Sequence, residues 1–504
     1  MSLPDKIKKY TLIFAPVLFL FFMLFVELDE KNSKITYMAA VAFLMAVFWV
    51  TEALPLAITA LFPLVLFPFF GIMNGKSVAS QYFNHIIFLF IGGFLMAIAM
   101  EKWSLHKRIA LKILLFFGNT LPKILLGFMA ATAFLSMWIS NTATAMMMVP
   151  IVFSVVLELE SLTEPQKVKN IATALFLGVA YSASVGGIAT LIGTPPNLTF
   201  ARIFNITFPL APEMTFAEWL VGAFPVSLAM FFLVWSFLTF TLLRSKEEFI
   251  VNKSIFRKEL VKLGKFSYEE KAVFICFVTL AFLWIFRSDI KIGSFILPGW
   301  STVFKMPAYI NDGTTAVLVA VALFIIPAKN KPGRLLEKDA ILKLPWHIIL
   351  LFGGGFALAA GFKESGLILY FAGLFHGIEN IHPLLLLMML CTIITFLTEL
   401  TSNTATAEIL LPILASLSIA MKVNPLFIMI PAVLSCSFAF MLPVATPPNA
   451  VIFGTDRVSI AQMAKTGFFL NIIGVFIISL IMYFASGSLM NIDLETMPDW
   501  AVLK

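Results

Sequence analysis

Apolar runs long enough to cross a bilayer as a helix, which takes about 20 residues, recur along the whole chain. Short polar or charged segments separate them, a pattern typical of helical membrane proteins with many spans. Two of the runs are interrupted by a pair of prolines. The pattern predicts eleven spans, at 10–27, 36–53, 56–70, 84–100, 171–205 (interrupted), 216–243, 271–287, 314–328, 345–361, 425–455 (interrupted) and 463–486.

Two further apolar stretches, 121–157 and 382–420, carry a polar phrase near the middle. Each half of such a stretch is shorter than a full span, so we predict two re-entrant helical hairpins. The predicted fold class is an all-α polytopic membrane protein with about 11 transmembrane helices plus these hairpins.

The polar phrases are one repeated motif. Ser-Asn-Thr-Ala-Thr-Ala stands at 140–145 and again at 402–407, and each copy is followed by a Thr-Pro-Pro-Asn break, at 194–197 and 446–449. Upstream, a His-Ile-Ile segment at 85–87 recurs at 347–349 with the same offset as the phrases. The first copy holds about ten more residues between phrase and break, which we expect in the polar 158–170 segment.

Five predicted crossings lie between His85 and His347, so the two repeats have opposite orientations in the membrane. Inverted repeats with interrupted helices are the architecture of secondary transporters, whose binding site lies near the midplane between the repeats. The segments 103–118 and 366–377 follow the matched spans and are predicted either as amphipathic surface helices or as plain loop helices.

Basic residues give the expected orientation. With the N-terminal lysines in the cytoplasm and the first span retained, eleven crossings place the basic segments 101–112, 244–271 and 329–343 inside. The 288–313 loop and the acidic tail lie outside. We therefore expect a multi-pass protein of the cell membrane with a cytoplasmic N-terminus and an external C-terminus.

Composition narrows the class further. The chain is 60% hydrophobic and 12% charged, which excludes an ordinary soluble protein, and its net charge of +7 is spread over loops rather than gathered in a nucleic-acid stripe. Three cysteines lie in apolar runs without metal-type spacing and are predicted to be inert core thiols.

The breaks carry the candidate chemistry. Paired prolines remove two successive backbone donors, and such a break is tolerated in a membrane only where protein or a wet cavity surrounds it. Half-helix N-termini there offer free N–H groups to an anion, and C-termini offer carbonyls to a cation. Two inverted copies predict two facing anion sites, and hence a ligand with two carboxylates.

The alternative is that Ser-Asn-Thr-Ala-Thr-Ala is only a small-residue packing face between helices. Two copies in matching register, each paired with a break, make this alternative weak. Asn141 and Asn403 weaken it further, because an unpaired amide in hydrocarbon costs several kcal/mol.

These four motifs, in this order and over nearly the whole chain, resemble the divalent anion/sodium symporter family, the INDY-like dicarboxylate and citrate transporters. The resemblance implies a homodimer with an elevator mechanism, in which each protomer has a scaffold domain and a mobile transport domain. The implied division is scaffold at 1–120 and 244–380, each part ending in an interfacial helix, and transport at 121–243 and 381–504.

By the same resemblance, the hairpin tips and the second break form the site. The implied substrate-binding residues are Ser140, Asn141, Thr142, Ser402, Asn403, Thr404, Thr446 and Pro447. In sodium-dependent members, the sodium ligands correspond to Ser136, Ser140, Asn141 and the carbonyl of Gly193 at one site, and to Thr398, Thr401, Asn403 and the carbonyl of Ala445 at the other.

Three carboxylates stand in or beside apolar segments. Glu408 departs from the repeat, since Met146 occupies the matching place, and it is either functional or a buried or surface structural group. Glu399 is expected to order the second hairpin. Glu52, like Glu408, is either functional or structural. His85 and His347 are predicted to be interfacial or hydrogen-bonded residues rather than ligands.

The leading hypothesis is a sodium-coupled symporter of C4 or C5 dicarboxylates such as succinate, malate, fumarate or 2-oxoglutarate. A sodium-independent dicarboxylate exchanger, or a citrate or sulfate transporter of the same fold, are the alternatives. An intramembrane enzyme is disfavoured, because the chain has no His-Glu-x-x-His, Gly-x-Ser-x-Gly or nucleotide-binding motif, and no cofactor is expected. A channel would lack the saturation and counterflow of a carrier.

Overall fold

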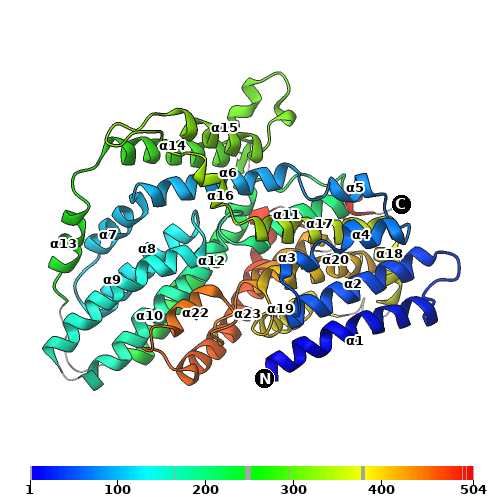
Figure 1. Cartoon of the computed structure of the whole chain (residues 1–504), viewed down its shortest axis with the longest axis horizontal. Coiled ribbons are helices and arrows are strands. Elements are labelled where there is room, and N and C mark those ends of the chain that lie inside the picture. Colours follow the sequence, from blue (N-terminus) through cyan, green and yellow to red (C-terminus); the bar gives the residue numbers. More distant parts are fainter. Residues whose placement is uncertain are drawn as a thin grey trace.

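The computed structural model describes residues 3–163, 165–243, 251–292, 295–375, 381–490, 492–494 and 496–502. Helices make up almost all of it (Figure 1). Up to the first broken helix and the span after it, the helices are α1 (Leu3–Phe25), α2 (Ser33–Thr51), α3 (Leu56–Thr59), α4 (Phe62–Phe69), α5 (Gly75–Ala79), α6 (His85–Lys102), α7 (Leu105–Phe116), α8 (Leu121–Ser136), α9 (Asn141–Leu162), α10 (Pro165–Gly187), α11 (Pro195–Thr207) and α12 (Phe216–Leu242).

The second part ends in the same order as the first, with a hairpin, a broken helix and a long span. Earlier in this part, between Ile285 and Asp312, lies a two-stranded antiparallel sheet, β1 (Ile290–Ile292) and β2 (Phe295–Leu297). Short 3-10 turns lie at Trp300–Val303, Pro307–Tyr309 and Asp499–Ala501. The helices are α13 (Ser254–Lys262), α14 (Tyr268–Ile285), α15 (Asp312–Ile325), α16 (Asp339–Leu342), α17 (Trp346–Ser365), α18 (Leu367–Leu374), α19 (Pro383–Thr398), α20 (Asn403–Ala420), α21 (Pro425–Cys436), α22 (Pro447–Phe453) and α23 (Ile460–Met490).

Every predicted span contains a helix or a pair of helices, and the predicted fold class is confirmed. Among the described residues, nine helices are long and apolar enough to cross a membrane, and shorter apolar helices such as α8, α15, α19 and α21 complete the set. Both predicted hairpins are present, as α8–α9 and α19–α20, and both interrupted spans are broken, as α10–α11 and α21–α22. The segments 103–118 and 366–377 contain α7 and α18, although residues 376 and 377 lie outside the described part.

One expectation about the repeat is wrong. The extra residues of the first copy do not form a polar loop at 158–170, because α9 continues to Leu162 and α10 begins at Pro165; residue 164 lies outside the described part. Instead they lengthen helices, since α10 has 23 residues where α21 has 12. A polar segment in a membrane protein can therefore be the solvated end of a long helix.

Side-chain caps fix where several helices begin. Asn84 accepts from the backbone N–H of Ile86 at 3.0 Å at the start of α6, and Asn311 accepts from Thr314 at 2.9 Å at the start of α15. Reciprocal capping boxes begin α12 and α14. Such caps satisfy amide groups that have no partner within the helix, which matters where little water is available.

Two hydrophobic cores hold the bundle together. The smaller core joins α1, α2 and α4 to α17 and α18, and the larger core includes the remaining long helices. Figure 1 shows the first helices at the lower right of the view and α7 to α10 at the left. All three cysteines are buried and free, as predicted.

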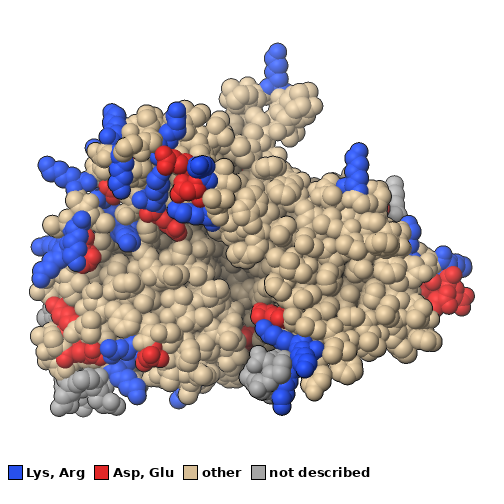
Figure 2. Space-filling view, in the orientation of Figure 1, with Lys and Arg blue, Asp and Glu red and all other residues tan. Residues whose placement is uncertain are grey.

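Charged side chains are unevenly spread over the surface. Figure 2 shows them gathered at the left of the view, over the region of α7 and α13, while most of the remaining surface on this face is uncharged. Exposed Phe, Leu and Val side chains are numerous on α1, α12 and α23, as lipid contact requires. The same face is hollowed near its centre.

Candidate functional site

The first hairpin turns between Ser136, the last residue of α8, and Asn141, the first residue of α9. Ser140 is the N-cap of α9, and its hydroxyl accepts from the backbone N–H of Ala143 at 3.2 Å. This predicted site residue therefore organises the tip, and its side-chain oxygen is already engaged.

Asn141 lies at the centre of an oxygen-rich cluster. One terminal atom of its carboxamide contacts the hydroxyl of Ser136 and lies 3.1 Å from the carbonyl oxygen of Gly193 and 3.2 Å from that of Ala183. The Ser136 hydroxyl in turn donates to the Ala183 carbonyl at 2.7 Å. Two arrangements satisfy these polar atoms. Either the amide nitrogen donates hydrogen bonds to the surrounding oxygens, or the amide oxygen and the surrounding oxygens bind one cation together.

Two glycines permit this close approach. A Cβ on Gly187 would lie 2.6 Å from the Asn141 carboxamide oxygen, and a Cβ on Gly193 would lie 2.4 Å from the Gly187 carbonyl oxygen. A larger residue at either place would push the break loop away from the hairpin tip. The predicted grouping of Ser136, Asn141 and Gly193 is therefore present in the structure.

The first break is tied down by neutral groups. Asn197, from the Thr-Pro-Pro-Asn motif, is fully buried and donates to the carbonyls of Thr190 at 2.7 Å and Ile188 at 3.3 Å. The hydroxyl of Thr190 donates to the carbonyl of Met137 in the hairpin turn at 2.5 Å. The break loop and the hairpin turn are thus one connected unit.

The second hairpin repeats the first cluster. Thr398, five residues before Asn403 as Ser136 is before Asn141, donates to the Asn403 carboxamide oxygen at 2.7 Å and to the carbonyl of Cys436 at 3.0 Å. In each repeat a hydroxyl thus links the tip asparagine to a carbonyl near the end of the first half of the broken helix.

Two predicted members of the second sodium site stand apart from this cluster. The Thr401 hydroxyl pairs with that of Thr406 at 2.6 Å and bonds to Leu397. Within the described part of the chain, no hydrogen bond joins the Ala445 carbonyl to Thr398 or Asn403. The structure therefore brings together the Thr398 and Asn403 side chains, and leaves the other two predicted ligands outside their hydrogen-bond network.

Asn449 does in the second break what Asn197 does in the first. It is fully buried and donates to the carbonyls of Ala439 at 3.0 Å and Leu442 at 3.1 Å, and its backbone N–H bonds to the Thr446 hydroxyl at 3.3 Å. The sequence motif contains both asparagines, but no role was predicted for them. Their position one turn into a half-helix, after two prolines, is the signal that points to it.

Glu399, which we expected to order the second hairpin, joins the end of that hairpin's first helix to the second break. Its two carboxylate oxygens accept from the backbone N–H groups of Met441 at 2.9 Å and Leu442 at 3.0 Å, and Asn471 on α23 donates to it at 2.7 Å. A carboxylate holding two backbone amides in a broken helix is a strong, charge-assisted anchor.

Glu408 is the unexplained carboxylate of this region. It is fully buried, and neither carboxylate oxygen has a hydrogen-bond partner among the described residues. The side chain packs against α17, where a Cβ on Gly355 would lie 2.4 Å from its Cγ. Glu52, in contrast, ends α2 in a left-handed conformation, is exposed, and lies 4.0 Å from Lys8.

The repeats meet by exchanging partners. The second half of each broken helix packs against the hairpin of the other repeat, α22 against α9 and α11 against α20. Thr446 is buried and Pro447 is exposed at the start of α22, while Thr142 is half-buried and Thr404 buried at the two tips. His85, at the start of α6, lies 4.0 Å from Glu213, and His347 is exposed.

A family model described as the sodium:sulfate symporter transmembrane region matches residues 6–490. This chain belongs to that family. Two relatives are the sodium-dependent dicarboxylate transporters SdcS of Staphylococcus saprophyticus, 41% identical over 489 residues, and of Staphylococcus aureus strain NCTC 8325, 40% identical over 491 residues. Each alignment covers 96% of this chain and 92% of the relative.

Family membership agrees with the likeness to solved structures. The YdaH transporter of Alcanivorax borkumensis and MtrF of Neisseria gonorrhoeae each align with a TM-score of 0.53 at 13% identity. The alignments cover 80% of this chain and 86% of YdaH, and 81% of this chain and 84% of MtrF. At this identity they show a shared fold and nothing about substrate.

Proposed function

We propose that the protein is a secondary active transporter that carries C4 or C5 dicarboxylates such as succinate, malate, fumarate or 2-oxoglutarate into the cell together with sodium. The observation that carries this proposal is the pair of matching oxygen clusters, Ser136 with Asn141 and Thr398 with Asn403, at the turns of two hairpins. The relatives named as sodium-dependent dicarboxylate transporters support the same substrate class and the same ion.

Sodium would bind beside the hairpin turns. Hydroxyl, carboxamide and backbone carbonyl oxygens are the ligands of hard cations, and the Asn141 cluster gathers all three kinds around one point. The break loop that ends at Gly193 supplies carbonyls that no helix uses. Ser140, Thr401 and Ala445 complete the proposed ligand set after small rearrangements of the tips.

The dicarboxylate would bind between the two tips. α9, α11 and α20 each begin at a polar motif, so the free N–H groups of their first turns can donate hydrogen bonds to a carboxylate, and no arginine is needed. We assign its contacts to Ser140, Asn141, Thr142, Ser402, Asn403, Thr404, Thr446 and Pro447. Two sodium ions would offset the two negative charges of the substrate. The electrostatic free-energy cost of crossing the membrane would therefore be lower for the dianion with its two sodium ions than for the dianion alone.

Movement would follow the elevator scheme. In this proposal the two hairpins, the two broken helices, α12 and α23 move together as the transport domain of each protomer in a homodimer, against a scaffold of the other long helices. The exchange of packing partners between the repeats, α22 with α9 and α11 with α20, supports movement of both tips as one unit.

Competition by ligands of different charge tests the substrate assignment. Purified protein in liposomes should take up labelled succinate, and unlabelled succinate should compete far better than butyrate, which has one carboxylate. Sulfate and citrate, the family alternatives, are included as further competitors. Equal competition by butyrate and succinate would contradict a site built for two carboxylates.

A further inference from the structure

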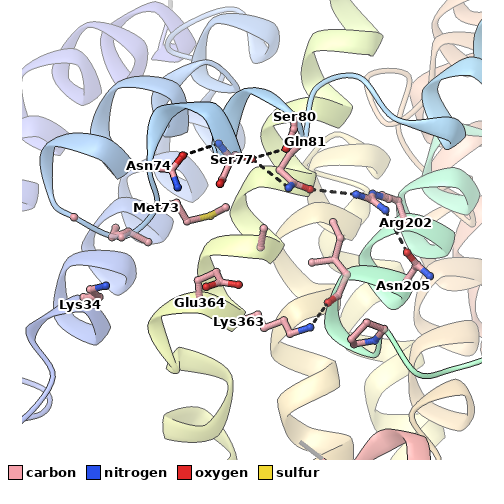
Figure 3. Close-up of a pocket in the computed structure, with 15 residues that line it drawn as sticks. Lys34, Met73, Asn74, Ser77, Ser80, Gln81, Arg202, Asn205, Lys363 and Glu364 are labelled. Atoms are coloured by element: carbon pink, nitrogen blue, oxygen red, sulfur yellow. Dashed lines mark hydrogen bonds between the residues drawn. The ribbon is translucent and has the colours of Figure 1, made fainter.

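A polar pocket of about 640 Å³ lies where α2 begins and α11 and α17 end (Figure 3). Three cations line it, Lys34, Arg202 and Lys363, against one carboxylate, Glu364. The rest of its wall combines neutral polar residues such as Asn74 with apolar ones. Its volume is within the range of small-molecule sites, about 300–1,000 Å³.

The guanidinium of Arg202 is only partly satisfied. It donates to the side-chain oxygens of Asn205 at 3.2 Å and Gln81 at 3.3 Å, both neutral, while its buried Nε has no hydrogen-bond partner. Among the described residues, no carboxylate lies within ion-pair distance of it. Figure 3 shows these two contacts holding the guanidinium at the wall of the pocket. An arginine held in this way retains donors for an incoming carboxylate.

The other two cations come from different helices. Lys363, near the end of α17, donates to the carbonyl of Ile206 in the last turn of α11 at 3.0 Å, and Lys34 is exposed in the first turn of α2. A lysine that caps a helix C-terminus keeps its charge and can exchange that carbonyl for a ligand oxygen. The pocket therefore offers positive charge from three helices, which suits a ligand with negative charge at both ends.

The pocket also has a defined side. Its wall includes Ser77 of α5, a helix at the right of Figure 1, whereas the basic segment of α7 and α13 lies at the left. The positive-inside rule places α7 and α13 in the cytoplasm, so the pocket faces the outside. Its walls join the broken helix α11 to α2, α17 and the loop before α6.

We propose that this pocket is an external capture site for the dicarboxylate, separate from the membrane-embedded site between the hairpins. The inference rests on the proposed function, because it takes the transported dianion as the ligand. A cationic pocket raises the local concentration of an anion and its rate of entry, and this effect weakens as salt screens it. It acts on one side of the membrane only.

The test compares charge variants from both faces of the membrane. The protein is reconstituted in one orientation in neutral phosphatidylcholine, and succinate KM is measured from each face at fixed sodium, with choline chloride setting the ionic strength. In Arg202→Gln and Lys363→Gln, the external KM should rise about three- to tenfold at low ionic strength, with less difference at high ionic strength. Maximal rates and the KM from the cytoplasmic face should stay unchanged.

Three matched variants keep the result specific. Lys305→Gln removes an exposed cation from a loop on the same predicted side and should change nothing. Gln81→Ala breaks the Arg202 contact but keeps its charge, and it should leave the external KM near the wild-type value. Arg202→Lys should restore part of the lost affinity.

Several results would overturn the capture site. These are an unchanged external KM in both charge variants, an equal rise on both faces, a Gln81→Ala effect as large as that of Arg202→Gln, or a KM change that appears only in anionic lipid, which would make the pocket a headgroup site. Failure of the wild-type protein to take up succinate at all would instead refute the proposed function.

Discussion

The two hairpins share one polar arrangement but are held in place by different chemistry. In both, a hydroxyl five residues before the tip asparagine links that asparagine to a carbonyl of the broken helix. The first break is then anchored by Thr190, a neutral residue, and the second by Glu399, a carboxylate that accepts three hydrogen bonds. The shared part is where we place ligand binding, and the different part is structural support.

The surroundings of the tips also differ. Met146, after the first Ala-Thr-Ala, is 58% exposed, and Glu408, at the matching place in the second repeat, is 0% exposed against α17. Pseudosymmetry therefore constrains the atoms at the tips more tightly than the helix faces behind them. Variants that remove a shared feature should therefore differ in effect from variants that remove an unshared one.

Removal of either tip asparagine should have the largest effect. Asn141→Ala or Asn403→Ala removes the central carboxamide of a cluster, and losing one charge-assisted hydrogen bond costs about 1.5–3 kcal/mol, a tenfold or greater loss of affinity. Uptake of succinate should nearly vanish in both variants while folding persists. Asn311→Ala, which removes only a helix cap, serves as the control. Uptake at the wild-type level in both tip variants would refute the assignment of the binding site to the hairpin tips.

The supports of the two breaks should differ in strength. Glu399→Gln weakens the hydrogen bonds to two backbone amides and leaves these amides poorly paired. The free energy of unfolding should therefore fall by about 2 kcal/mol. Thr190→Val removes one neutral hydroxyl and should cost about 1 kcal/mol. Thermal unfolding in detergent measures both, with the exposed Glu337→Gln as a control. A larger loss for Thr190→Val would reverse the comparison.

The smallest effect is expected at Glu408. Its carboxylate makes no hydrogen bond with a described residue, so Glu408→Met, which installs the residue of the first repeat, should leave stability unchanged or raise it by about 1 kcal/mol. Glu408→Gln keeps a buried polar group and should be less stable than Glu408→Met. A loss of more than about 2 kcal/mol in Glu408→Met would mean that the carboxylate is held by a favourable interaction.

Much of the fold follows from sequence, because each span in a membrane must be a helix of limited length. A break in such a helix needs polar or proline residues, and these are visible in the sequence. Hydropathy therefore located the spans, and the repeated Ser-Asn-Thr phrase located both turns. The family resemblance, rather than the pattern itself, paired Ser136 with Asn141 and Thr398 with Asn403, and the structure brings the side chains of each pair together.

Long-range partners were not predictable in the same way. The carbonyls of Ala183 and Cys436 join the clusters only because α10 and α21 pack beside the hairpins, and backbone carbonyls leave no trace in a sequence. Asn471 reaches Glu399 from α23, a contact that depends on how the last helix packs. The extra residues of the first repeat were misplaced because polarity at a helix end looks the same as polarity in a loop.

Sodium dependence of uptake into empty liposomes tests the central claim most directly. Purified protein with nothing but buffer inside should accumulate labelled succinate when sodium is present outside, with a steep rise as sodium increases, and almost none when potassium replaces it. Asn141→Ala and Asn403→Ala should remove the sodium response. Uptake that ignores sodium and requires dicarboxylate inside the liposomes would contradict the account and identify an exchanger.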